Sequence, residues 1–257
     1  MRQLEAAIRV RGMAVNYPHG HELPLHDHDW AQLIYASRGV MSVHSAAGTW
    51  VVPAHRAVWV PAGVAHRISM SGAVAMRTLY LDPGLAGAGP SHCTVVNVSP
   101  LLRELVLRAV ELAPLYETEP AHARLIGVLV DEIQSLPVVP LRVPVPRDAR
   151  AQRAAEWLRR NPDAAASLAE VARRAGASKR TLERLFLRET GMSLGSFREQ
   201  VRLMRALELL AAGGSVTEVA LSVGYASASA FIARFRRVLG TTPGRYYAGA
   251  EGLHPPV

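Results

Sequence analysis

The sequence predicts an α+β protein in which a β-rich N-terminal half precedes an all-helical C-terminal half. Between about residues 12 and 80, short runs of β-branched and aromatic residues alternate with turns that contain glycine or proline. Beyond residue 149 the apolar residues recur at helical spacing, and one pattern of polar, small and glycine residues occurs twice. A proline-rich stretch separates the two halves.

Five runs in the N-terminal half have the composition of β-strands, and Gly39, Gly48 and Gly63 are among the turn residues that separate them. Many short strands at close spacing favour a sandwich or a small barrel. The five runs span residues 30–35, 40–44, 49–52, 57–60 and 75–80.

Two helical stretches follow, at about residues 100–113 and 120–136. In the second, Leu125, Leu129 and Ile133 recur every fourth residue and define an apolar face. We expect these apolar helices to support dimerisation.

The stretch after these helices, residues 137–146, contains four prolines, so it is excluded as a helix and reads as an extended linker. The predicted parts are therefore a β-barrel domain at residues 1–90, a helical segment at 91–136, a linker at 137–148 and a helical domain at 149–250.

Composition limits the class of protein. A chain of 257 residues is long enough for two domains, and an apolar content of 49% excludes a largely disordered protein. No run of about 18 uncharged apolar residues offers a membrane span, and the first residues lack the apolar stretch of a secretory signal. The single cysteine, Cys93, has no partner for an internal disulfide, which fits a reducing compartment. We therefore expect a cytoplasmic protein without a membrane partner.

The positive charge is concentrated in the C-terminal half. Residues 1–147 hold 12 basic and 11 acidic residues, whereas residues 148–257 hold 17 and 10, so the second part carries +7 of the net +8. A basic module of this kind is the footprint expected of contact with phosphate. All basic residues except Lys179 are arginine, which suits bidentate contacts but is equally explained by a GC-rich genome.

The repeated pattern follows the rules of a helix-turn-helix motif. Ser167 opens a short amphipathic helix, Ala172 lies in its middle and Gly176 ends it; 48 residues later the same roles fall to Ser215, Ala220 and Gly224. A second apolar-periodic helix follows each glycine, at an offset of 49, so the second turn is one residue longer. Glycine permits the left-handed turn, and alanine lets two helices cross closely.

Specific apolar, aromatic, glycine and proline residues mark the two copies: Ala172, Gly176, Leu182, Phe186, Gly191, Gly224, Tyr225, Phe231, Phe235, Gly240, Pro243 and Tyr246. With them, residues 149–247 resemble the DNA-binding domain of the AraC/XylS family of bacterial transcription regulators. The resemblance implies a sequence-specific regulator that binds double-stranded DNA and acts as a homodimer. RNA polymerase is a further candidate partner.

On the first recognition helix, the resemblance implies that Arg180, Glu183 and Arg184 face base edges, with Ser178 and Lys179 beside them. Arginine donates two hydrogen bonds to the edge of guanine, and glutamate accepts a hydrogen bond from the cytosine amine. In an alternative interpretation, Glu183 only pairs with Lys179 at i,i+4 spacing.

The second recognition helix departs from the family pattern, because Ala228, Ser229 and Ala233 replace longer polar or arginine side chains. We therefore expect the first module to read the sequence and the second mainly to position the DNA through phosphates. Alternatively, these charges form a solvated face. The residues expected at this second surface are Ser227, Ala228, Ser229, Arg234, Arg236 and Arg237.

Histidines form a second pattern in the N-terminal half. His26, His28 and Gln32 resemble the first metal-binding motif of the cupin superfamily, with glutamine where glutamate is usual, and residues 61–66, which end in His66, resemble part of the second motif. The glycine and asparagine that usually flank that second motif are missing. Histidines separated by one residue on a strand point to the same face. The resemblance implies a cupin-like barrel with a site for a divalent transition metal (Zn, Ni, Fe or Cu).

Three interpretations of His26, His28 and His66 remain open: a bound metal, a metal-free pocket that hydrogen-bonds a small effector, and scaffold remnants without a ligand. Amide oxygen is a poorer metal ligand than carboxylate, so Gln32 weakens the case for catalysis. The sequence therefore predicts a regulator that responds to a small ligand or metal ion, and not an enzyme. The alternatives are a cupin metalloenzyme with an accessory DNA-binding tail, and a purely architectural DNA-binding protein, which leaves the barrel unexplained.

Overall fold

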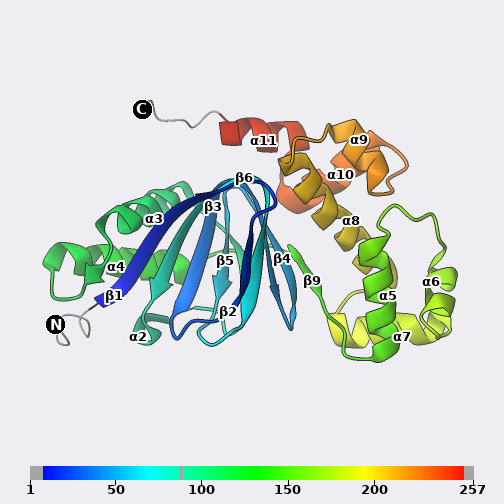
Figure 1. The fold of residues 1–257 in the computed structure, drawn as a ribbon, viewed down its shortest axis with the longest axis horizontal. Coiled ribbons are helices and arrows are strands. Elements are labelled where there is room, and N and C mark those ends of the chain that lie inside the picture. The colour runs from blue at the N-terminus through cyan, green and yellow to red at the C-terminus, as the bar shows by residue number, and fades with distance from the viewer. Residues whose placement is uncertain (1–7, 87–88, 252–257) are drawn as a thin grey trace. The chain divides into compact units, whose positions relative to one another are not determined.

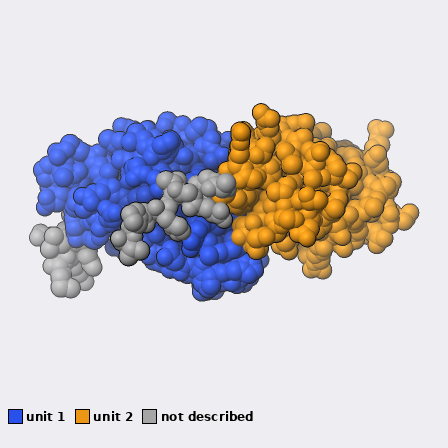
Figure 2. Space-filling model, turned by 90° about the horizontal axis from the view of Figure 1, so that it is seen from above, with its two compact units in different colours: residues 1–45, 50–140, 250–257 blue, residues 46–49, 141–249 orange. Residues whose placement is uncertain are grey.

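The computed structural model describes residues 8–86 and 89–251 and divides the chain into two compact units (Figure 2). Unit 1 contains residues 1–45 and 50–140, together with 250–257, and unit 2 contains residues 46–49 and 141–249. Unit 1 holds an antiparallel sheet with helices, and unit 2 is mainly helical (Figure 1). The predicted fold class, a β-rich half followed by an all-helical half, is confirmed.

Two long antiparallel strands organise unit 1. Strands β3 and β6 pair along their whole length, so that Ala31 lies opposite Leu81 and Ser45 opposite His66. Three shorter strands pair with different parts of these two: β1 and β2 pair with the two ends of β6, and β5 pairs with the first part of β3. The strands are β1 (Ile8–Tyr17), β2 (Glu22–His26), β3 (Ala31–Ser45), β4 (Gly48–Pro53), β5 (Arg56–Val60), β6 (His66–Leu81), β7 (Thr94–Asn97) and β8 (Leu115–Tyr116).

The strands predicted at residues 30–35 and 40–44 belong to one strand, β3. Its register with β6 shifts on either side of Arg38, and Gly39 has a φ of +78°. An irregularity of this kind bends a strand without ending it, which explains why the sequence shows a turn where the structure has none.

The domain boundary predicted at residue 90 is wrong. Strand β7 pairs with β5 and therefore extends the sheet past that point. Helices α3 (Pro100–Leu112) and α4 (Pro120–Gln134) are found where the sequence predicts helices, and they lie against the sheet (Figure 1). Helix α3 crosses β1 at Gly12, where a Cβ atom would come within 2.9 Å of the Val110 backbone.

The apolar faces of α3 and α4 share one core with the sheet. Leu102 and Val106 of α3 and Leu129 of α4 are fully buried in the same cluster as sheet residues such as Leu33 and Leu79. The helical periodicity that suggested dimerisation is thus accounted for by packing within unit 1. Dimer formation stays a prediction.

The proline-rich stretch is extended, as predicted, but it is not a free linker. It contains the short strand β9 (Arg142–Pro144), and the side chains of Leu141 and Val143 are buried. Residues from 141 onward belong to unit 2, so this unit begins before the predicted boundary at residue 149.

Unit 2 contains two helix-turn-helix modules joined by the long helix α8 (Leu194–Ala211). The turns match the sequence analysis, and at Gly224 (φ +86°) a Cβ atom would come within 2.9 Å of the Asp163 backbone, so glycine is required there. No helix in the described ranges is long and apolar enough to cross a membrane. The other helices are α5 (Ala149–Arg160), α6 (Leu168–Arg174), α7 (Lys179–Thr190), α9 (Val216–Ser222), α10 (Ala228–Leu239) and α11 (Pro243–Glu251).

Aromatic side chains fix the second helix of each module. Phe186 of α7 packs edge-on against Phe197 of α8, with ring centroids 4.9 Å apart. In the second module Phe231 and Phe235 of α10 are fully buried, and Phe235 also contacts Tyr246 of α11. These packed faces orient the opposite faces of α7 and α10 toward solvent.

Candidate DNA-binding surface and metal centre

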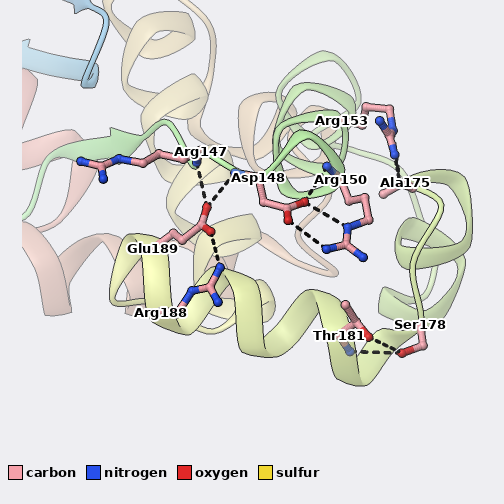
Figure 3. Close-up of polar contacts among 9 residues, drawn as sticks. All are labelled: Arg147, Asp148, Arg150, Arg153, Ala175, Ser178, Thr181, Arg188 and Glu189. Atoms are coloured by element: carbon pink, nitrogen blue, oxygen red, sulfur yellow. Dashed lines mark hydrogen bonds and ion pairs between the residues drawn. The ribbon is translucent and has the colours of Figure 1, made fainter.

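The outward face of α7 is basic. Lys179, Arg180 and Arg184 are exposed, and none of them forms an ion pair within residues 8–86 and 89–251. The hydroxyl of Ser178 accepts a hydrogen bond from the Thr181 amide at 3.1 Å and so caps the helix (Figure 3). Three cations are thus available to phosphates or base edges, beside a serine with a structural role.

The carboxylate of Glu183 has a partner that neither sequence-based interpretation named. One of its carboxylate oxygens accepts a hydrogen bond from the Leu194 amide at 3.0 Å, at the start of α8. No ion pair between Glu183 and Lys179 is found among the described residues. Glu183 therefore connects the recognition helix to α8, and this hydrogen bond competes with the predicted contact to cytosine.

The outward face of α10 has shorter side chains. Ser227 caps the helix through the Ala230 amide at 3.2 Å, Ala228 is half-buried and Ser229 is exposed. Of the three arginines predicted to contact phosphates, Arg236 and Arg237 are exposed, while Arg234 is half-buried with its Nε shielded from solvent.

A carboxylate ties the end of α7 to the start of α5. Glu189 accepts hydrogen bonds from the Arg147 and Asp148 amides at 2.8 and 2.9 Å, and its other oxygen pairs with Arg188 at 2.8 Å (Figure 3). These hydrogen bonds hold the pKa of Glu189 below its ordinary value, and the one from the Asp148 amide is the main cause. The segment that enters unit 2 is thereby fixed to the first recognition helix.

Replacing Glu189 with alanine should lower the free energy of unfolding by about 1–3 kcal/mol, because two amides lose a charged acceptor. Urea denaturation of the full chain at pH 7 measures this. Because the pKa of Glu189 is depressed in the folded protein, its contribution to the free energy of unfolding is fully present above the ordinary glutamate pKa. This contribution should disappear as the pH falls through the lower pKa of the folded state. The control is Glu156→Ala, which removes an exposed ion pair with Arg160 and should change stability by less than about 1 kcal/mol. Equal effects would contradict this role.

In unit 1, the three predicted histidines come together. His26 ends β2 and lies opposite His66 on β6, while His28 follows in the next loop. The ring centroids are 4.4 Å apart for His26 and His66, 4.9 Å for His26 and His28, and 5.7 Å for His28 and His66. Each ring offers one nitrogen to a set that lies within 4.8 Å.

Hydrogen bonds to backbone carbonyls orient two of these rings. His26 Nδ1 lies 2.7 Å from the Pro24 carbonyl oxygen, and His66 Nδ1 lies 2.8 Å from that of Val64. A carbonyl oxygen can only accept a hydrogen bond, so the Nδ1 atoms of His26 and His66 carry the proton and their Nε2 atoms keep a lone pair. The Nε2 atoms of His28 and His66 are shielded from solvent and have no hydrogen-bond partner among the described residues. Backbone-anchored imidazoles of this kind are the usual arrangement of metal-binding histidines.

The surroundings favour neutral imidazoles. Burial lowers the pKa of His28 below 6.5, and the neighbouring His26 lowers it further, against the opposing charge of Asp27. Burial is also the main cause of the lowered pKa of His66, which is fully shielded from solvent. Neutral imidazole is the form that binds a metal.

Gln32 lies on the same face of the sheet but has its own partner. It pairs across the strands with Tyr80, and its amide nitrogen donates to Thr78 Oγ1 at 3.0 Å. Its buried Oε1 has no hydrogen-bond partner among the described residues. The residues present therefore fit a divalent metal held by three imidazoles, with an amide oxygen on the same face of the sheet.

The cluster borders an open pocket of about 670 Å³ that the sequence analysis did not identify. His28 is one of its lining residues, and the ring of Tyr80 lies edge-on to His28 at 4.9 Å. Arg11 lies over the ring of Trp30 at 4.7 Å. The sequence signal for this position is the alternation of apolar residues along residues 66–81, which places Tyr80 on the same face of the strand as His66.

A β-rich unit with a ligand-sized pocket, joined to a unit with two helix-turn-helix modules, is the architecture of DNA-binding regulators that carry a ligand-binding domain. Two family descriptions match accordingly: an AraC-like ligand binding domain over residues 14–126 and a helix-turn-helix domain over residues 171–249. The chain is 35% identical to the HTH-type transcriptional regulator NimR of Escherichia coli over 232 residues, 90% of this chain and 85% of that protein. It belongs to the AraC family of transcription regulators.

Other similar proteins match a smaller part of the chain or match it more weakly. The chain is 42% identical over 125 residues to the HTH-type transcriptional regulator RipA of Corynebacterium glutamicum, covering 47% of this chain and 37% of that protein. A crystal structure of ToxT from Vibrio cholerae with bound unsaturated fatty acid covers 96% of this chain and 98% of that one at 11% identity, with a TM-score of 0.41. The two sequence relatives, NimR and RipA, are transcriptional regulators, and they give the metalloenzyme alternative no support.

Proposed function

We propose that this chain is a sequence-specific regulator of transcription that responds to a divalent transition metal bound in a cupin-like sensor domain. The observation that carries the metal proposal is the histidine cluster: one nitrogen from each of the three rings lies within 4.8 Å of the others, and the Nε2 atoms of His28 and His66 are shielded from solvent and have no hydrogen-bond partner among the described residues. Zinc, nickel, iron and copper all suit imidazole ligands. We expect the regulator to meet both the metal and its DNA in the cytoplasm.

The metal would be held by His26, His28 and His66, with Gln32 as a weaker oxygen donor, and it would supply positive charge at this face of the sheet. The residues of the chain prepare the site. The Pro24 and Val64 carbonyls fix the orientation of two rings, and burial keeps His28 and His66 neutral at pH 7. A site prepared in this way binds metal without first losing protons.

A second candidate is a metal-free site for an organic effector. The pocket beside His28 favours it, because Arg11, Trp30 and Tyr80 offer a cation and aromatic surfaces to a ligand. Metal analysis of protein purified without an affinity tag distinguishes the two. Stoichiometric metal that is retained on gel filtration supports the first candidate, and its absence together with failure to take up zinc supports the second.

DNA recognition is divided between the two modules in this proposal. Helix α7 presents Lys179, Arg180 and Arg184 for base edges and phosphates, while α10 presents Arg236 and Arg237 for phosphates. The test is electrophoretic mobility shift of full-length protein on duplexes selected from a random pool. Enrichment of one sequence, with affinity that depends on zinc, supports the proposal; an absence of enrichment contradicts it. A homodimer is expected to bind a site with two matching halves.

Replacing Arg184 with alanine should cost about 1–3 kcal/mol of binding free energy and relax base preference at one position, as expected for a lost bidentate contact. Replacing Arg236 should weaken binding to all duplexes alike, because phosphates carry no base identity. Fluorescence anisotropy on the selected duplex and its single-base variants measures both. Identical selectivity profiles for the two variants would contradict this division.

A further inference from the structure

The outward face of α10 changes character along its length. Opposite the buried Phe231 and Phe235, the exposed residues of the first half are Ser229, Ala230 and Ala233. The exposed charged residues of α10 come only in its last turn, with Arg236 and Arg237, while Arg234 before them is half-buried. Residues near the start of a recognition helix are those that reach base edges, so this helix presents methyl and hydroxyl groups to the bases.

The same face contains a shallow depression. It is lined by Ser229, Ile232, Ala233, Arg236, Arg237 and Thr242. Ala233 thus lies in a surface hollow next to the apolar Ile232, with Arg236 and Arg237 beside it. On helix α7, by contrast, the exposed residues Lys179, Arg180 and Arg184 are long cations.

The chemistry of the major groove indicates what an apolar hollow can recognise. The edges of adenine, guanine and cytosine offer donors and acceptors there, and thymine alone carries an apolar group, its C5-methyl. Alanine side chains contact that methyl group favourably. Flanking arginines hold phosphates and fix the distance between helix and groove.

We propose that α10 is a thymine reader: the hollow at Ala233 receives a thymine C5-methyl group, while Arg236 and Arg237 bind the flanking phosphates. This rests on the proposed DNA-binding function and adds base preference to a helix otherwise assigned to positioning. Ala233 is the specificity-determining residue, and Ala230 borders the same face.

The experiment uses the full-length chain and a duplex selected from a random pool. Each thymine in the half contacted by the second module is replaced singly by deoxyuridine, which removes only the methyl group. Loss of one methyl from an apolar contact should weaken binding about fourfold at one or two positions. Replacement of thymines elsewhere should leave affinity unchanged.

Two variants sharpen the test. Ala233→Arg, an exposed change that the helix accommodates, should abolish the deoxyuridine effect and shift the preferred base toward guanine. Arg184→Ala on α7 should keep the deoxyuridine effect while losing preference in the other half. Selection of a site whose second half lacks thymine, or unchanged affinity for all deoxyuridine duplexes, would overturn the inference. Failure to select any sequence would instead overturn the proposed function.

Discussion

Replacing both His26 and His28 with alanine should weaken zinc binding by about a hundredfold or more, since loss of even an outer partner of a metal ligand costs roughly 10- to 100-fold. Two of the three converging imidazoles disappear, and His66 alone offers one nitrogen. Calorimetric titration with zinc measures the loss. DNA binding without zinc should stay as in the parent chain, and the zinc-dependent change in that binding should disappear.

The sequence provides a matched control for this variant. His19 and His21 are also separated by one residue, but His19 accepts a hydrogen bond from the Gly72 amide and His21 stacks on Tyr17, away from the cluster. Their double alanine variant should bind zinc as the parent does. Equal zinc affinity for both double variants would exclude the histidine cluster as the metal site.

The pH dependence of zinc binding follows from the lowered pKa values. His28 and His66 have pKa values below 6.5, so protonation of these two rings competes with zinc only as the pH falls below that value. In the metal-free protein the unfolded chain takes up protons first as the pH falls through 6.5. The free energy of unfolding therefore decreases from there down to the folded pKa values.

The fold could be predicted where the local pattern and the tertiary structure agree. Gly176 and Gly224 end short amphipathic helices, and both turns have left-handed glycines. The pattern failed where long-range pairing decides: Gly39 reads as a turn, yet pairing with β6 continues on both sides of it. The four residues of β7 were missed because a short strand is stabilised by its neighbour β5 rather than by its own sequence.

The candidate site shows the same division. The sequence predicted the histidine cluster, but strand alternation accounts for only part of it: His26 and His66 lie opposite each other on β2 and β6, whereas His28 lies in the loop after β2. The hydrogen bond from the Leu194 amide to Glu183 joins two helices across a turn. No helical periodicity contains that information, so the sequence could only suggest a base contact or an i,i+4 pair.

A fragment of residues 141–250 should bind the selected duplex specifically without unit 1, and its affinity should fall steeply with salt. If about six phosphates are contacted, raising the salt from about 50 to 200 mM should cost roughly a thousandfold, because each neutralised phosphate releases bound counterions. Anisotropy titrations at several salt concentrations give the slope, and a random duplex gives the reference. Equal affinity for both duplexes at every salt concentration would contradict specific binding.

The start of that fragment decides its stability. A fragment that begins at residue 149 loses the Asp148 cap, which accepts from the Arg150 amide at 2.9 Å, and the amides that bind Glu189. It also lacks the Val143 carbonyl, which accepts a hydrogen bond from the Arg159 guanidinium at 3.1 Å. Arg159 is a buried cation, as its lowered pKa indicates, so the loss of an acceptor should be costly there. We expect the shorter fragment to be less stable by about 2–4 kcal/mol. Urea denaturation of both fragments checks this, and equal midpoints would show that the segment before α5 is a linker after all.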